Sequence, residues 1–152
     1  MKVITVIQPW ATLIAIGEKK FETRSWATKY RGVLAIHAGK KIDKAACRRE
    51  PIRSVLANHG YDETNLPTGV ILALGCLHEC WPVMYDLSDP AWIGFERVER
   101  DEQAVSVSAV RGNEYHFGDY SPGRFAWELS AVTRLSKPIP AKGQLSLWNW
   151  EG

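Results

Sequence analysis

Apolar and polar positions alternate in several short runs of the chain and predict a protein built mainly of β-strands. β-branched and aromatic side chains are frequent in these runs, and turn-forming residues separate them. The predicted strands cover residues 2–7, 21–26, 33–38, 69–80, 125–129 with an extension over 132–135, and 145–150. The period of two residues therefore indicates about six short strands.

Two other segments have a helical pattern. Pro9 suits a first helical turn, and the apolar positions that follow it end at Gly17, a residue typical of a helix C-terminus. Asp43 suits the N-cap of a polar segment that reaches His59, and Pro51 should divide that segment in two. We expect one early helix and one divided helical segment.

Prolines are expected to end strands in the second half of the chain. Pro82 should end the strand over residues 69–80, and Pro138 and Pro140 should mark a turn. Residues 83–118 are acidic and hard to assign, and they predict a large excursion between strands.

The order of these elements favours an α+β fold, a small β-barrel of five to six strands with helices at its rim. A parallel α/β sheet would need a helix between successive strands, and that rhythm is missing after residue 69. A chain of 152 residues suits one ordinary domain, and it contains no repeat or linker. We therefore expect a single domain over residues 1–152.

Charge is unevenly distributed along the chain. The formal net charge is only +2, which is not a nucleic-acid signature by itself. Residues 17–50 contain ten Lys/Arg and four Asp/Glu, a net of +6, whereas residues 85–102 contain six acids and two bases, a net of −4. Such an asymmetry can make one face attractive to phosphate groups.

The three cysteines do not suggest a disulfide framework. Cys76 and Cys80 flank His78, and on a regular strand the three side chains would share one face. Structural zinc sites usually draw their ligands from two pairs, and a second pair is missing from the sequence. We therefore expect buried thiols in a reducing compartment, with neither a metal nor a cofactor.

No apolar run is long enough to span a bilayer, and the N-terminal apolar run is interrupted at Pro9, too early for a signal peptide. We expect a cytoplasmic protein without a membrane partner.

The densest chemistry lies in residues 17–24, which read G-x-K-x-x-E-x-R. On a strand Glu22 and Arg24 point to the same side, and Lys19 would approach them from the preceding turn. Three such charges facing one cleft suit a polar, anionic ligand. Spacing alone favours the alternative, an ordinary solvated ion-pair strand on the surface, so the surrounding sequence has to decide.

Several motifs together resemble the ASCH domain, the module named for activating signal cointegrator 1 homology, which is related to the PUA-like superfamily. The matching residues span most of the chain: Gln8-Pro9-Trp10-Ala11, the G-x-K-x-x-E-x-R string, Arg31-Gly32, Ile36-His37-Ala38, Gly123 to Leu129 and Leu147 to Trp150.

The resemblance implies a PUA-like barrel with a cleft between the barrel and the first helix, lined by the motif residues. It also implies binding of RNA or another nucleic acid, or of a nucleoside-like small molecule. Some similar proteins are amidohydrolases of N4-acetylcytidine, and a ribonuclease role is proposed for others. Those deacetylases carry a nucleophilic threonine at the position of Glu22, so a carboxylate here would require a different mechanism.

The candidate site residues follow from the motif and its flanks. Lys19 and Glu22 would be catalytic only if the protein is an enzyme, a question the sequence leaves open. Trp10 and Trp26 are candidates for stacking on a base, and Gln8 for reading a base edge or capping the helix. The candidate ligand-binding residues are Gln8, Trp10, Lys19, Glu22, Arg24, Trp26, Lys29, Arg31 and Lys40.

A wider basic zone flanks the motif strand and could track a phosphate backbone. It comprises Lys29, Arg31, Lys40, Lys41, Lys44, Arg48 and Arg49. His37 is expected to be a satisfied core or rim histidine. A third reading, a protein-interaction adaptor, rests only on the acidic residues 85–102.

Overall fold

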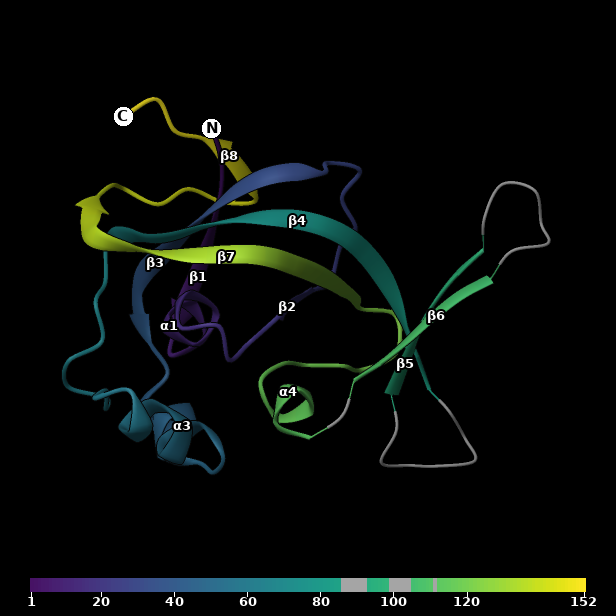
Figure 1. The fold of residues 1–152 in the computed structure, drawn as a ribbon, viewed down its shortest axis with the longest axis horizontal. Coiled ribbons are helices and arrows are strands. Elements are labelled where there is room, and N and C mark those ends of the chain that lie inside the picture. The colour runs from purple at the N-terminus through teal and green to yellow at the C-terminus, as the bar shows by residue number, and fades with distance from the viewer. Residues whose placement is uncertain (86–92, 99–104, 111) are drawn as a thin grey trace.

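The computed structural model describes residues 1–85, 93–98, 105–110 and 112–152 (Figure 1). These residues form the strands β1 (Lys2–Gln8), β2 (Phe21–Arg24), β3 (Gly32–Ile42), β4 (Val70–Tyr85), β5 (Ile93–Val98), β6 (Val105–Val110), β7 (Phe125–Pro140) and β8 (Leu147–Asn149). The helices are α1 (Trp10–Ala15), α2 (Lys44–Arg48), α3 (Ile52–Asn58) and α4 (Asn113–His116).

Six strands form one curved mixed sheet in the order β2-β7-β4-β3-β1-β8. β1 runs parallel to β3, and the other neighbours in this order are antiparallel. The long strands β4 and β7 arch across the molecule, and α1 lies on their concave side (Figure 1). The expected α+β class and the six strands are confirmed, but the sheet is not closed into a barrel, because β2 and β8 stand at opposite ends of the order.

Two strands continue through prolines that were expected to stop them. β4 runs through Pro82 to Tyr85, because at this point its partner changes from β7 to β5 and a missing N–H is tolerated. β7 runs to Pro140, since β2 covers only its first residues and leaves the rest of that edge unpaired within the described part of the chain. The predictions of a strand end at Pro82 and a turn at Pro138 are therefore wrong.

The predicted helices are present. Asp43 caps α2 as predicted, since its Oδ1 accepts a hydrogen bond from Ala46 N at 3.0 Å, and Pro51 separates α2 from α3. α1 ends two residues before Gly17, which has a φ of 84° and turns the chain toward β2.

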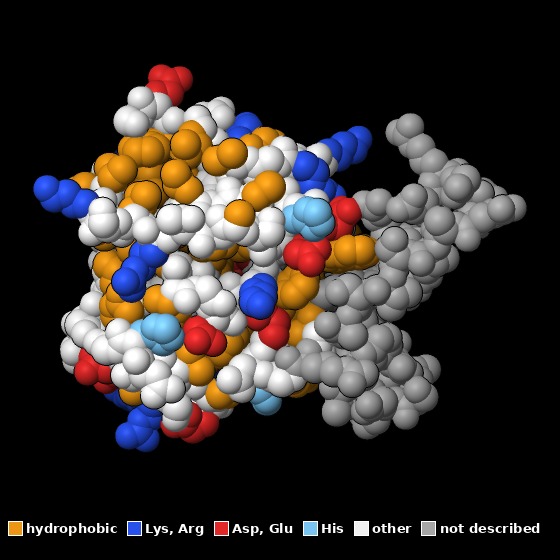
Figure 2. All heavy atoms as spheres, viewed as in Figure 1, with side chains coloured by type: hydrophobic (Ala, Val, Ile, Leu, Met, Phe, Trp, Pro, Cys, Tyr) orange, Lys and Arg blue, Asp and Glu red, His pale blue; other side chains and the backbone are white. Residues whose placement is uncertain are grey.

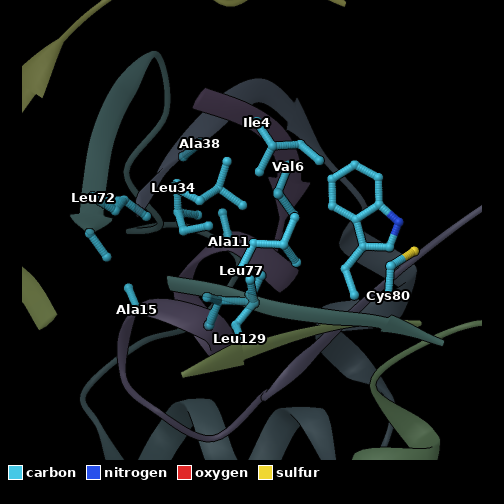
Figure 3. Packing of buried hydrophobic residues seen from close by; sticks show 14 residues of the cluster. Ile4, Val6, Ala11, Ala15, Leu34, Ala38, Leu72, Leu77, Cys80 and Leu129 are labelled. Carbon is cyan, nitrogen blue, oxygen red and sulfur yellow. The ribbon is translucent and has the colours of Figure 1, made fainter. Parts of the chain in front are cut away.

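Helix α1 is packed against the sheet by a buried apolar cluster. Ala11 and Ala15 of α1 lie among Leu34, Leu77 and Leu129 of the strands (Figure 3). A second cluster joins α1 to α2 and α3 and includes Leu13, Cys47, Ile52, Leu56 and Phe117. Phe117 is fully buried there, so the chain that follows α4 is anchored beside α1.

The predicted excursion over residues 83–118 contains the β5–β6 hairpin and α4. Residues 86–92, 99–104 and 111 lie outside the described residues, and with them lie most of the acidic positions of residues 85–102. Among the described residues, no helix is both long and apolar enough to cross a membrane.

Candidate functional site

A pocket of about 470 Å³ opens between β1 and β2, two strands that are not neighbours in the sheet. β1 contributes Thr5 to Ile7 to its wall and β2 contributes Glu22 to Arg24, while the remaining wall comes from α1, the link between α2 and α3, the end of α4 and the chain between α4 and β7. The other lining residues are Trp10, Arg49, His116, Phe117, Gly118, Asp119 and Arg124. We call this the first pocket.

Glu22 and Arg24 lie on the same side of β2, as the strand period predicted. Arg24 Nη2 is 2.9 Å from Glu22 Oε2 and donates a second hydrogen bond to the carbonyl oxygen of Thr5 at 2.8 Å. The Arg24 side chain remains 25% exposed, whereas the Glu22 side chain is only 10% exposed. One side chain therefore joins β2 to β1 at the pocket and still presents charge to it.

Lys19 lies behind this pair instead of facing the pocket. Its ammonium group is buried, donates to the carbonyl oxygen of Phe117 at 2.8 Å and lies 3.8 Å from Glu22 Oε1. Burial lowers the pKa of Lys19, while the charges of Glu22 and Glu114 act in the opposite direction. Lys19 thus holds the Glu22 carboxylate and the backbone at Phe117 in place from the buried side of the pocket wall.

Glu114 of α4 ties the same chain to the start of the motif strand. Its carboxylate accepts hydrogen bonds from the backbone N–H groups of Lys20 and Phe21 at 3.0–3.1 Å. Burial raises the pKa of Glu114, and the charge of Lys19 partly offsets this effect. Burial, together with the charges of Glu114 and Glu22, also raises the pKa of Tyr120.

The wall formed by residues 116–119 is held close to β2. Thr23 Oγ1 accepts from Asp119 N at 3.1 Å, and Arg124 Nε donates to Asp119 O at 3.1 Å. A Cβ at Gly118 would lie 3.1 Å from the Thr23 side chain, so this approach favours glycine. Thr23 lines the first pocket together with Glu22 and Arg24, although strict alternation predicted that it would face away.

The charges around the first pocket leave an excess of cations. Arg24 and Lys19 surround Glu22, and Arg124 Nε lies 3.5 Å from Asp119 Oδ2. Arg49 is exposed and forms no ion pair with a carboxylate of the described residues. The pocket therefore suits an anionic group.

Trp10, Glu22 and Arg24 are the predicted site residues that line the first pocket. Gln8 is buried and caps α1: its Oε1 accepts from Thr12 N at 2.9 Å, and its Nε2 donates to Pro67 O at 2.7 Å. Trp26 packs edge-on against Trp127, with ring centroids 4.7 Å apart, and is not a lining residue.

The predicted basic residues lie elsewhere on the surface. Lys29, Arg31 and Lys40 are exposed and do not line the first pocket. Arg31 donates to Glu79 at 2.6 Å, and Lys40 lines a separate pocket of about 370 Å³. On the face of the molecule that Figure 2 shows, the described Lys and Arg side chains are scattered among acidic ones, without a continuous basic patch.

Sequence reasoning missed part of the pocket wall. Arg49 appeared only within the wider basic zone, and Arg124 only within a family motif. His116, Phe117, Gly118 and Asp119 carry no local signal, because their contacts with Lys19 and Thr23 join residues more than 90 positions apart.

The C-x-H-x-C residues do not converge. The register between β4 and β7 shifts between Leu77 and Glu79, which interrupts the alternation of side chains. Cys80 is consequently buried in the core cluster while His78 is exposed. His37 is buried, with Nδ1 3.2 Å from Thr5 Oγ1 and Nε2 2.7 Å from Ala141 O.

Comparison with known proteins identifies the family. The model of the ASCH domain matches residues 4–139, a range that begins in β1 and ends in β7 and includes all the residues that line the first pocket. A search of curated proteins finds no match to the chain. The extent of the family match confirms the resemblance seen in the motifs, and the chain belongs to the ASCH domain family, a PUA-like family.

Proposed function

We propose that this ASCH domain binds RNA, or a nucleotide-like ligand, in the first pocket. ASCH domains are in general RNA-binding modules. The observation that carries the proposal is that Glu22 and Arg24 of the family motif line one pocket together with Arg49, Arg124 and Trp10. Its volume of about 470 Å³ falls within the range of roughly 300–1,000 Å³ that is typical of small-molecule sites.

Four of the lining residues have specific roles in this proposal. The guanidinium groups of Arg24 and Arg49 bind phosphate, and the ring of Trp10 stacks on a base. Glu22 accepts from Thr23 N at 3.2 Å and from Arg24 at 2.9 Å. A carboxylate has about four acceptor sites, so Glu22 can also accept from the amino group of a base such as cytosine.

The proposal is tested with a short, labelled single-stranded RNA and fluorescence anisotropy at low salt. We expect Arg24→Gln to weaken binding by about tenfold, since a hydrogen bond to a charged group contributes about 1.5–3 kcal/mol. Lys29→Gln is the matched control, because it removes an exposed charge outside the pocket and should leave affinity unchanged. Equal affinities of wild type and a folded Arg24→Gln variant would refute the proposal.

A second candidate function is a hydrolase that acts on a modified nucleobase such as N4-acetylcytidine, or a ribonuclease. The lowered pKa of Lys19, 3.8 Å from the Glu22 carboxylate, favours it. The Lys19 ammonium is covered by the Phe117 carbonyl, so residues 116–119 must move before Lys19 touches a substrate. Absence of turnover of acylated cytidines and RNA above a Lys19→Ala control would exclude this function.

A further inference from the structure

A second pocket of about 340 Å³ adjoins the first. Four residues belong to both walls: Arg49, His116, Gly118 and Asp119. The second pocket is completed by Glu50, Ile52, Tyr115, Tyr120 and Ser121. The two pockets therefore lie side by side, and the end of α4, the chain directly after it and the Arg49 side chain belong to both walls.

The second pocket is lined by an exposed tyrosine ring that packs against a buried one. Tyr115 is 40% exposed, and its ring stacks on that of Tyr120, with centroids 6.3 Å apart and an interplanar angle of 26°. Tyr120 itself is only 3% exposed. A ring held in this way from one side resembles the stacking platforms on which single-stranded nucleic acids lay successive bases.

The charges of the second pocket suit a base better than a phosphate. Its wall includes the carboxylates of Glu50 and Asp119, and both accept hydrogen bonds from neighbouring serines. These acids would repel an anion inside the pocket, but they can accept from the amino group of a base. Arg49 lies at the boundary of the two pockets and forms no ion pair with the described carboxylates, so it is the group placed to bind a phosphate between two bases.

We propose that the ligand is single-stranded RNA whose successive nucleotides occupy the two pockets. One base enters the first pocket beside Trp10, the next stacks on Tyr115, and Arg49 binds the phosphodiester that joins them. This inference rests on the proposed function, because it requires a nucleotide in the first pocket.

The test compares the mononucleotide 5′-CMP with the dinucleotide pCpC by isothermal titration calorimetry. Wild-type protein should bind pCpC more tightly than 5′-CMP. Tyr115→Ala should weaken binding of pCpC by about tenfold, since a stacked base contributes about 1–3 kcal/mol, and should leave 5′-CMP binding unchanged. Tyr115→Phe keeps the ring and is the matched control, with wild-type affinity for both ligands.

Arg49→Gln provides a second readout that is independent of the ring. For pCpC it should lower the slope of log affinity against log salt by about 0.7, the value for one phosphate contact on a single strand. The matched variant Lys29→Gln removes an exposed cation outside both pockets and should leave the slope unchanged.

The outcomes separate the two proposals. If 5′-CMP binds in an Arg24-dependent manner but pCpC gains no affinity, or loses none in Tyr115→Ala, the second subsite is refuted and the proposed function stands. If neither ligand nor a longer RNA binds to wild-type protein, both proposals are refuted.

Discussion

The guanidinium of Arg24 lies 2.9 Å from the carboxylate of Glu22 on the same side of β2. The same nitrogen reaches the carbonyl oxygen of Thr5 on β1 at 2.8 Å. Behind the pair, the buried ammonium of Lys19 lies 3.8 Å from the other oxygen of Glu22. The three motif charges therefore form a layered arrangement in which Glu22 links a buried cation to a cation that faces the pocket.

Replacement of Glu22 should destabilise the protein. Glu22→Ala leaves the ammonium of Lys19 buried without its nearest carboxylate, and removal of one partner from a buried pair costs about 3 kcal/mol or more. The free energy of unfolding from urea titration measures this effect. Arg48→Ala is the control, because it breaks the ion pair between Arg48 and Glu63 at the surface, where the Arg48 side chain is 67% exposed. Its loss of unfolding free energy should be much smaller. Similar losses in both variants would contradict the layered arrangement.

Local pattern was sufficient for the elements that carry the motif. The period of two residues located β1 and β2, and the helix signals at Pro9, Gly17, Asp43 and Pro51 agree with α1, α2 and α3. Strand ends were less predictable, because whether a proline ends a strand depends on the partner at that position. Pro82 sits where β4 changes partners, a property of the whole sheet.

The position of Lys19 shows why the site could be predicted only in part. Sequence spacing brings Lys19, Glu22 and Arg24 together, and the structure agrees. The group that covers Lys19 is the carbonyl oxygen of Phe117, 98 residues away, and any residue type could supply it. Such backbone contacts leave no pattern in the sequence, so the burial of Lys19 could not be predicted from the motif.

Loss of Glu114 should release the pocket wall from the motif strand. Glu114→Ala removes the acceptor of the Lys20 and Phe21 N–H groups and should lower the free energy of unfolding by about 1–2 kcal/mol. It should also weaken RNA binding, because the pocket wall of residues 116–119 begins at the last residue of α4. Glu18→Ala, which removes an exposed carboxylate paired with His59 at 3.3 Å, is the control and should change neither property. A wild-type free energy of unfolding in Glu114→Ala would show that the hydrogen bonds from Lys20 and Phe21 to Glu114 do not stabilise the fold.

Burial of Lys19 predicts a specific dependence of stability on pH. Burial lowers the pKa of Lys19 in the folded protein below the value of 10.5 that the residue has in the unfolded chain. Between these two pKa values the unfolded chain binds more protons than the folded protein, so the free energy of unfolding rises as the pH rises. Lys19→Met lacks this contribution. The wild-type protein should therefore gain stability relative to Lys19→Met as the pH is raised from neutral toward 10.5.

Urea titrations of both proteins at several pH values measure this difference. Lys20→Met removes one exposed positive charge from the neighbouring position, and subtracting its effect corrects for the change in net charge. A corrected difference that stays constant over the interval would mean that the Lys19 ammonium is not desolvated in the folded protein.

Trp10 and Trp26 flank the motif, and binding measurements should separate them. Trp10 lines the first pocket, so Trp10→Leu should weaken RNA binding by about tenfold, in line with the roughly 1–3 kcal/mol that a stacked base contributes. Trp26 packs edge-on against the fully buried Trp127, so Trp26→Leu should lower the free energy of unfolding by about 1 kcal/mol and leave affinity unchanged. RNA anisotropy and urea titration of each variant give both quantities. If Trp26→Leu weakens binding and Trp10→Leu does not, the base stacks outside the first pocket, and the roles assigned to Glu22 and Arg24 fail with it.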